Sequence, residues 1–190
     1  LIISCGRIPE PIPEWVTQSE SNSKYWIGVG SAKDRDSAIN NAMNSIASQI
    51  SLQIESKMTN LKIEKNNEII NYTRNIIETR VNIYLPQVEM QKVVLHNKTW
   101  YALVELNKEN YYFQLATKRE NARQAAVQLI NQNLDSSIID RMKALYSAWE
   151  QIMPYLDVPI TANINGKQNV NIYAEIQNQF RKLIVGINIS

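Results

Sequence analysis

The chain has 190 residues, of which 44% are hydrophobic and 20% are charged, which is enough for one globular domain and a smaller second unit. Only 5 Gly and 6 Pro occur, and apolar residues run along the whole length, which excludes a disordered, collagen-like or low-complexity protein. The net charge of +2 comes from scattered basic residues, so we expect no nucleic acid as a partner.

The single cysteine, Cys5, lies close to the amino terminus. The apolar residues Leu1-Ile2-Ile3 lead through Ser4 to this thiol, and Gly6 follows it, a pattern that resembles the lipobox of bacterial lipoproteins. The resemblance implies that Cys5 receives a lipid and becomes the first residue of the mature protein, while Gly6 is compatible with sorting to the outer membrane. Because the preceding residues are too few for a signal peptide, we expect the precursor to extend further upstream. The alternative is a strand that begins here with a buried free cysteine.

A proline- and serine-rich segment follows, with Pro9, Pro11 and Pro13 near its start. Proline fixes φ and lacks a backbone donor, so residues 7–13 are predicted to be extended. Together with the lipobox remnant the segment forms a tether over residues 1–23. Trp15 follows the prolines as an isolated aromatic residue, and it either latches the tether to the domain or inserts into a partner.

Residues 24–30 alternate as a strand does, with Tyr25, Ile27 and Val29 on one face and glycines on the other, where we expect close packing. Ser31 or Asp34 can cap the amphipathic helix that follows. From residue 49 onward the apolar pattern also fits a strand, and we expect the helix to give way to a long strand there.

The next elements are predicted to be a helix over residues 68–85, stopped by Pro86, and a β-hairpin of residues 88–95 and 99–106. The turn of this hairpin contains Asn97, which tolerates the left-handed conformation. Trp26 and Trp100 lie on predicted strands, where large rings ordinarily fill the interface between helix and sheet.

A helical hairpin is predicted over residues 111–154. Ser137 and Asp140 resemble a capping box, and the apolar stripe that follows needs a partner, for which the preceding helix is the simplest candidate. Tyr111, Tyr112 and Phe113 place rings all around one helical turn, so at least one of them, with Tyr112 as our candidate, faces another surface.

Residues 155–190 predict the start of a second small α/β unit that continues beyond residue 190: two short strands around Asn165-Gly166 and then a helix. The predicted fold class is therefore α+β. Residues 24–110 are predicted to form a small sheet with a long amphipathic helix packed on it. An antiparallel helical hairpin and a short unit of β-hairpin and helix follow.

The order of several motifs resembles the Lpp-twenty family of bacterial lipoproteins over roughly residues 5–110. The matching pieces are Cys5 with its linker, residues 13–16 (PEWV), residues 25–32 (YWIGVGSA), the alanine-rich helix with residues 49–51 (QIS), and residues 100–106 (WYALVEL). The resemblance implies a compact α+β domain on a lipidated tether. It also implies likeness to the amino-terminal domain of the flagellar T-ring assembly protein, with no known catalytic centre.

The residue types that carry catalysis are sparse. His96 is the only histidine and lies in a predicted turn, which excludes a histidine-based triad or a multi-histidine metal site within one chain. Gly28-Val29-Gly30 lacks the third glycine and the lysine of phosphate-binding loops. Asp34 and Asp36 point apart at a helix start and serve its cap and dipole. We therefore expect no enzyme activity, no cofactor and no metal.

These patterns predict a lipid-anchored protein of the bacterial outer membrane, on the periplasmic side, that acts as an interaction or assembly module. Its expected partners are the membrane, through Cys5, other envelope proteins and a second copy of the chain. The candidate interaction residues are Trp15, Tyr112, Tyr146, Trp149 and Tyr155. The alternative is a periplasmic lipoprotein that binds a small molecule or a glycan in a cleft between the sheet and the helical hairpin, where Tyr146, Trp149 and Tyr155 converge.

Overall fold

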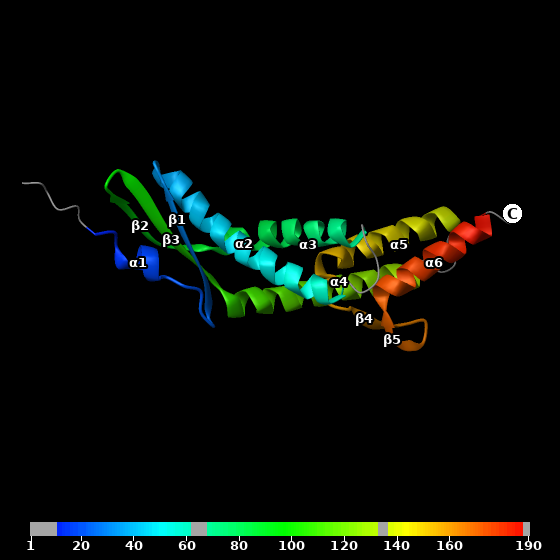
Figure 1. Ribbon diagram of the computed structural model, residues 1–190. Coiled ribbons are helices and arrows are strands. Elements are labelled where there is room, and N and C mark those ends of the chain that lie inside the picture. Colours follow the sequence, from blue (N-terminus) through cyan, green and yellow to red (C-terminus); the bar gives the residue numbers. More distant parts are fainter. Residues whose placement is uncertain (1–10, 62–67, 133–136, 188–190) are drawn as a thin grey trace, which may run out of the picture. The chain divides into compact units, whose positions relative to one another are not determined.

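The computed structural model describes residues 11–61, 68–132 and 137–187, and Cys5 lies outside these ranges (Figure 1). The fold class is α+β, as predicted: helices are combined with two small antiparallel sheets. The chain divides into two compact units, each made of separate stretches of sequence. Unit 1 contains residues up to 49 together with 87–108, and unit 2 contains 50–86 together with residues from 109 onward.

Unit 1 is built on a three-stranded antiparallel sheet in the order β1-β3-β2. Its strands are β1 (Tyr25–Ala32), β2 (Glu89–His96) and β3 (Thr99–Asn107). The hairpin of β2 and β3 confirms the prediction, and Asn97 and Lys98 in its turn both have positive φ. The short helix α1 (Glu14–Gln18) and the first part of α2 (Arg35–Leu61) complete the unit.

The close packing expected at the glycines of β1 is present, and it is the glycine face that packs on α2. A Cβ atom built on Gly28 would lie 2.1 Å from the carbonyl oxygen of Ala42, and one on Gly30 would lie 2.2 Å from the Ala42 nitrogen. Gly28 pairs with Val104 in β3, and Gly30 pairs with Ala102. The missing side chains therefore let the backbone of α2 approach the sheet directly.

The start of α2 is fixed by Asp34, one of the two capping residues predicted. Its carboxylate accepts a hydrogen bond from the backbone N–H of Ser37 at 2.8 Å. This bond holds the pKa of Asp34 below its usual value, as expected for a carboxylate that caps the positive end of a helix.

The end of the expected tether is bound to unit 1. The hydroxyl of Ser21 accepts a hydrogen bond from the backbone N–H of Ile27 at 2.8 Å. The side chain of Asn22 accepts from the N–H groups of Lys24 and Tyr25 at 2.8 and 2.9 Å. Within the expected tether, residues 14–18 form the helix α1.

The expected change from helix to strand near residue 49 is wrong, because α2 continues to Leu61. Ile46, Ile50, Ile54 and Met58 follow one another at the four-residue spacing of a helix, and all four are buried. Leu52, which suggested the alternation of a strand, is 65% exposed.

Unit 2 contains the rest of α2 and the helices α3 (Glu68–Tyr84), α4 (Lys108–Gln132), α5 (Ile138–Ile152) and α6 (Ile172–Ile187). The helix predicted over 68–85 is thus confirmed as α3, and the 3-10 turn η1 (Leu85–Gln87) follows it at Pro86. A second 3-10 turn, η2 (Met153–Tyr155), follows α5. Within the described residues, no helix combines the length and the apolar character that crossing a bilayer requires.

The second sheet of the fold is the predicted hairpin of β4 (Thr161–Ile164) and β5 (Lys167–Asn171). Asn165 and Gly166 form its turn with φ of 50° and 76°, the left-handed conformation that this dipeptide favours. The hairpin leads directly into α6, and the N–H of Ile172 donates to the carbonyl of Ile160.

The helix α5 begins at the predicted capping box. The hydroxyl of Ser137 accepts from the backbone N–H of Asp140 at 3.2 Å and donates to its carboxylate at 2.7 Å. The prediction named the preceding helix as the partner of the apolar stripe of α5. In the structure α5 packs against α6, and the two helices lie side by side with their sequences running in opposite directions (Figure 1).

Candidate functional site

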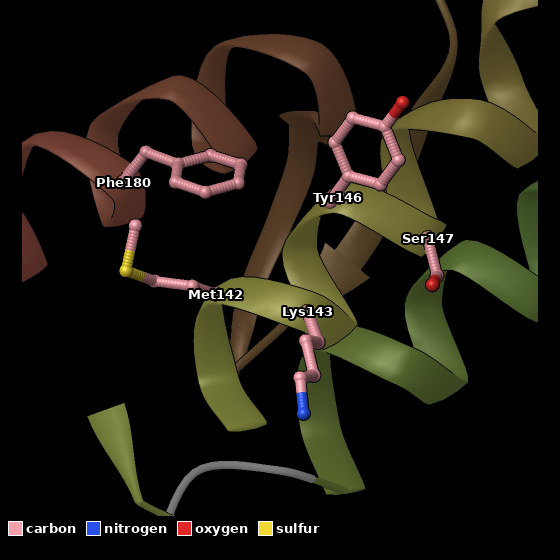
Figure 2. Close-up of a pocket in the computed structure, with 5 residues that line it drawn as sticks. All are labelled: Met142, Lys143, Tyr146, Ser147 and Phe180. Atoms are coloured by element: carbon pink, nitrogen blue, oxygen red, sulfur yellow. The ribbon is translucent and has the colours of Figure 1, made fainter. Parts of the chain in front are cut away.

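An open hollow lies on the surface of unit 2, between α5 and α6. It has a volume of about 520 Å³ and is lined by Met142, Lys143, Tyr146, Ser147 and Phe180. Figure 2 shows the side chain of Met142 beside the ring of Phe180, with Tyr146 above and Lys143 pointing away from both rings. Apolar atoms provide most of this lining.

The hollow is part of a wider apolar area. The helices α5 and α6 run in opposite directions, and Met142 and Tyr146 of α5 face Phe180 of α6. The first turn of α5 therefore lies beside the last turns of α6. Both ends expose large apolar side chains. We call the area the α5–α6 surface, and it consists of Ile138, Ile139, Met142, Tyr146, Phe180, Ile184 and Val185.

Four basic residues are close in sequence to the residues of the α5–α6 surface. Arg141 and Lys143 lie on the first turns of α5, and Arg181 and Lys182 lie on α6 directly after Phe180. Asp140 is the acidic residue in the same stretch, and it lies 4.0 Å from the ammonium group of Lys143. Residues 138–147 and 180–186 therefore carry a formal charge of +3, from four cations and one carboxylate.

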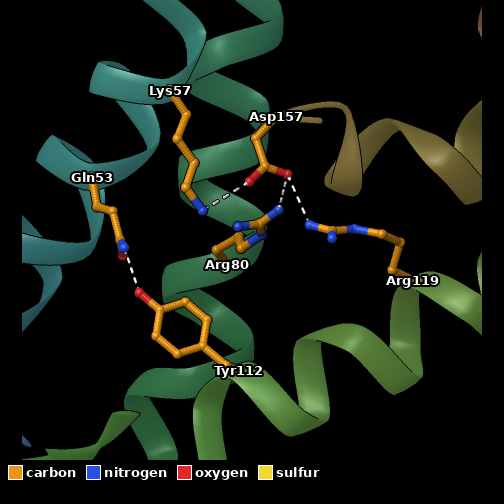
Figure 3. A network of polar contacts seen from close by, with 6 residues as sticks. All are labelled: Gln53, Lys57, Arg80, Tyr112, Arg119 and Asp157. Atoms are coloured by element: carbon orange, nitrogen blue, oxygen red, sulfur yellow. Dashed lines mark hydrogen bonds and ion pairs between the residues drawn. The ribbon is translucent and has the colours of Figure 1, made fainter. Parts of the chain in front are cut away.

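Unit 2 also contains a buried charge cluster of Lys57, Arg80, Arg119 and Asp157 (Figure 3). Asp157 lies in the turn after η2, and its carboxylate bonds to the guanidinium of Arg80 from α3. Arg119 from α4 lies 3.3 Å from the same oxygen, and Lys57 from α2 lies 3.8 Å from the other. One carboxylate thus joins α2, α3 and α4 to the turn that follows α5.

The ion pair at the centre of the cluster is removed from water. The side chain of Arg80 is 2% exposed and that of Asp157 is 0% exposed, whereas Arg119 and Lys57 reach the surface. Burial lowers the pKa of Arg80, but the charge of Asp157 and the hydrogen bond to it outweigh this effect and raise it. Arg80 is therefore charged in the folded protein.

Three tyrosines lie next to the cluster. Tyr84 and Tyr111 have ring centroids 4.4 Å apart. Burial raises the pKa of Tyr84 to about 12 and also raises the pKa values of Tyr111 and Tyr155, and the charge of Arg80 lowers each of the three in part. The hydroxyl of Tyr84 is buried, and no hydrogen-bond partner for it is found among the described residues.

The candidate interaction residues lie in different places. Tyr146 is exposed on the α5–α6 surface, and its ring lies 5.6 Å from that of Trp149, which is half-buried. Tyr155 does not share this position: it is 8% exposed and lies near Arg80 and Arg119, so its ring offers little surface to a partner. Trp15 is half-buried in α1.

Tyr112, the candidate on α4, is partly exposed and engaged with neighbours. Its hydroxyl accepts a hydrogen bond from the side-chain amide of Gln53 in α2 (Figure 3). The ammonium group of Lys57 lies 6.0 Å from the centre of its ring, and the ring of Tyr111 lies 5.2 Å away, edge to face. Tyr112 thus packs along the edge of the charge cluster.

The buried pair of Arg80 and Asp157 was not among the residues that the sequence singled out. One signal for it exists, because Arg80 continues the spacing of Thr73, Ile76 and Tyr84, the buried positions of α3. A charged residue in an apolar stripe indicates a buried partner. The partner is 77 residues away, at a distance that no local pattern reveals.

The charge cluster and the α5–α6 surface suit different roles. The charge cluster has a structural role, because the carboxylate of Asp157 is buried and pairs with groups of the protein itself. The α5–α6 surface is open and largely apolar, with Lys143 beside it, which suits contact with another surface. In the described part of the chain, no group of three or more His, Cys, Asp or Glu side chains is arranged to hold a metal ion.

Comparison with known proteins gives one family match. The model of the LPP20 lipoprotein family matches residues 13–107, which is half of the chain. No curated protein matches the chain. Among solved structures, the chain is similar to the secreted protein HP1454 from the human pathogen Helicobacter pylori, with 16% identity and a TM-score of 0.46. That alignment covers 83% of this chain and 60% of the Helicobacter pylori chain.

Proposed function

The chain belongs to the LPP20 lipoprotein family, and from this premise we propose that it is an envelope lipoprotein that acts as a non-catalytic interaction or assembly module. The family match carries the first part of the proposal. In it, Cys5 bears the lipid, the outer membrane is the anchoring bilayer, and the folded units lie on the periplasmic side.

The sequence before the matched region supports an anchor at Cys5. Apolar residues and a serine precede the thiol, and three prolines follow before α1 begins. A single acyl chain binds a bilayer only reversibly, whereas two or more hold a protein there, since each buried CH₂ contributes about 0.8 kcal/mol. Lipid on Cys5 would thus keep both units at a membrane surface.

The α5–α6 surface supports the proposal of an interaction module. Ile139 is 66% exposed and Val185 is 56% exposed, and they lie on the two helices that line the hollow. Apolar side chains gathered on one face are typical of a surface that contacts another molecule, and scattered ones are not.

The anchor is tested in the native host with the complete precursor. The parent and a Cys5→Ala variant are labelled with a fatty-acid analogue and fractionated. We expect the parent to carry the label and to sediment with outer membranes, and the variant to lose both. Ser19→Ala, in the same segment, is the matched control and should behave as the parent does. A variant that stays with membranes as fully as the parent would refute anchoring through Cys5.

The interaction role is tested by cross-linking in living cells. A photoreactive amino acid in place of Tyr146 should form adducts with envelope components, and the same amino acid in place of Lys167, on the β4–β5 hairpin, should not. Equal yields at the two positions would show that the α5–α6 surface has no occupant and would remove the basis of this part of the proposal.

A further inference from the structure

We infer that the α5–α6 surface is a second membrane contact, which docks on a bilayer that contains anionic lipids. The inference rests on the proposed function, because it names the partner of the surface already described. It adds a contact made by side chains, separate from the acyl chains on Cys5.

The first argument is the shape and chemistry of the surface. Ile138, Met142 and Tyr146 follow one another at four-residue spacing along α5, and Phe180 and Ile184 do so along α6. The two lines meet across the hollow and form one apolar strip on the open side of the helix pair. A strip of this kind can enter the boundary between headgroups and acyl chains without the helices crossing the bilayer.

The second argument is the charge around the strip. Residues 138–147 and 180–186 carry a formal charge of +3, whereas the whole chain carries +2. The rest of the chain therefore has a net charge of −1, so the positive excess lies in the two segments that form the apolar strip. Basic residues beside an apolar face complement anionic headgroups, and their attraction falls with rising salt.

The third argument is the accessibility of the groups involved. Lys143 is 75% exposed, and Arg181 and Lys182 are exposed on the turn that follows Phe180. Long basic side chains can lie along an apolar surface and reach outward to phosphate groups. Lys143, which lines the hollow, and Arg181, the residue after Phe180, are therefore the cations closest to the apolar strip.

The test uses the purified full chain with Cys5→Ala, so that no acyl chain contributes. Flotation with vesicles of phosphatidylcholine alone and of phosphatidylcholine with phosphatidylglycerol measures binding. We expect binding to the anionic vesicles that weakens at high salt, and little binding to the neutral ones. The double variant Ile139→Ser with Val185→Ser should bind at least about 10-fold more weakly.

Two matched controls make the result specific to this surface. Leu52→Ser with Phe113→Ser removes two exposed apolar side chains elsewhere in unit 2 and should bind as the parent does. Lys143→Gln with Arg181→Gln should weaken binding at least about 10-fold, while Lys118→Gln with Lys167→Gln, which changes the net charge equally, should have a smaller effect. Circular dichroism and thermal unfolding confirm that each variant is folded.

Absence of binding to anionic vesicles would overturn the inference, and so would equal loss in the matched controls. Adducts at position 146 that contain a protein and no lipid would also overturn it and identify a protein partner. The outcome for Cys5 is separate: an unmodified thiol on the native protein would refute the anchor while vesicle binding by the α5–α6 surface still stands.

Discussion

The carboxylate of Asp157 is the centre of the charge cluster in unit 2. It is fully buried, it bonds to the buried guanidinium of Arg80, and Lys57 and Arg119 approach it from two further helices. A buried ion pair contributes little net stability compared with apolar residues, but removal of one partner leaves an uncompensated charge. The stability of unit 2 should therefore be sensitive to either residue of the pair.

We predict that Asp157→Asn lowers the free energy of unfolding by about 3–5 kcal/mol, because Arg80 then stays buried without a counter-ion. Urea unfolding followed by circular dichroism measures this change. The double variant Arg80→Met with Asp157→Leu removes both charges and should recover part of the loss.

Asp36→Asn is the control for this prediction, because that carboxylate is 85% exposed beside Arg35. We expect it to change the free energy of unfolding by less than about 1 kcal/mol. An Asp157→Asn variant as stable as the Asp36→Asn variant would show that the charge cluster does not hold unit 2 together.

Tyr84 makes the stability of the folded protein depend on pH in the alkaline range. Burial raises its pKa from 10.0 to about 12, so between these values the unfolded chain has lost the phenolic proton and the folded chain has kept it. The stability that the Tyr84 phenol contributes is complete below pH 10.0, and it is lost as the pH rises through about 12.

We predict that Tyr84→Phe is at least as stable as the parent at neutral pH, because the buried hydroxyl has no hydrogen-bond partner among the described residues. Above a pH of about 10 the variant should lose stability less steeply than the parent. Urea unfolding at a series of pH values measures both effects. Identical slopes for the two proteins would exclude Tyr84 as the titrating group.

Among the elements, β1 and α2 form the part of the fold that the sequence predicts best. The alternation of residues 24–30 predicts β1, Asp34 predicts the start of α2, and the glycines of β1 predict the close packing between the two elements. The end of α2 was predicted wrongly, because Leu52 and Ile54 alternate locally while the buried positions follow the helical spacing up to Met58. Two periods overlap in that stretch, and only tertiary packing decides between them.

The contact between β1 and α2 predicts a sharp difference between two glycines. Gly30→Ala places a methyl group 2.2 Å from the Ala42 nitrogen and 2.4 Å from the Ala38 carbonyl oxygen, both of them backbone atoms. The helix must move away from the sheet, so we expect a loss of at least about 1–3 kcal/mol. Thermal unfolding measures the change.

Gly186→Ala is the matched substitution, since a methyl group there meets nothing within 4 Å. This glycine lies in α6, where alanine is the better helix former by up to about 1 kcal/mol, so the variant should be equal to or more stable than the parent. Equal destabilisation by the two substitutions would contradict the close packing of β1 on α2.

At the scale of the whole molecule, the division into units is what the sequence does not predict. Sequence patterns placed boundaries at 24–110, 111–154 and 155–190, whereas contacts group residues 50–86 with those from 109 onward. Hydrophobic periodicity describes one element at a time. The pairing of Arg80 with Asp157 joins residues far apart in the chain, and local patterns indicate a buried charge at Arg80 but do not identify its partner.

This division predicts how a fragment limited to the family match should behave. Residues 13–107 include α3 with Arg80 but lack Asp157, α4 and α5. Hydrogen exchange followed by mass spectrometry should show fast exchange of the α3 amides in the fragment and slow exchange in the full chain. Slow exchange of α3 in the fragment would show that the region after residue 108 is not needed to fold it.

The pair of Arg80 and Asp157 also has a consequence for the history of this lineage. One partner lies inside the segment that the family shares, and the other lies outside it. Loss of the carboxylate alone would leave a buried cation without a counter-ion, so the two positions are expected to change together. Relatives of this chain that keep the fold of unit 2 should therefore carry both charges or neither.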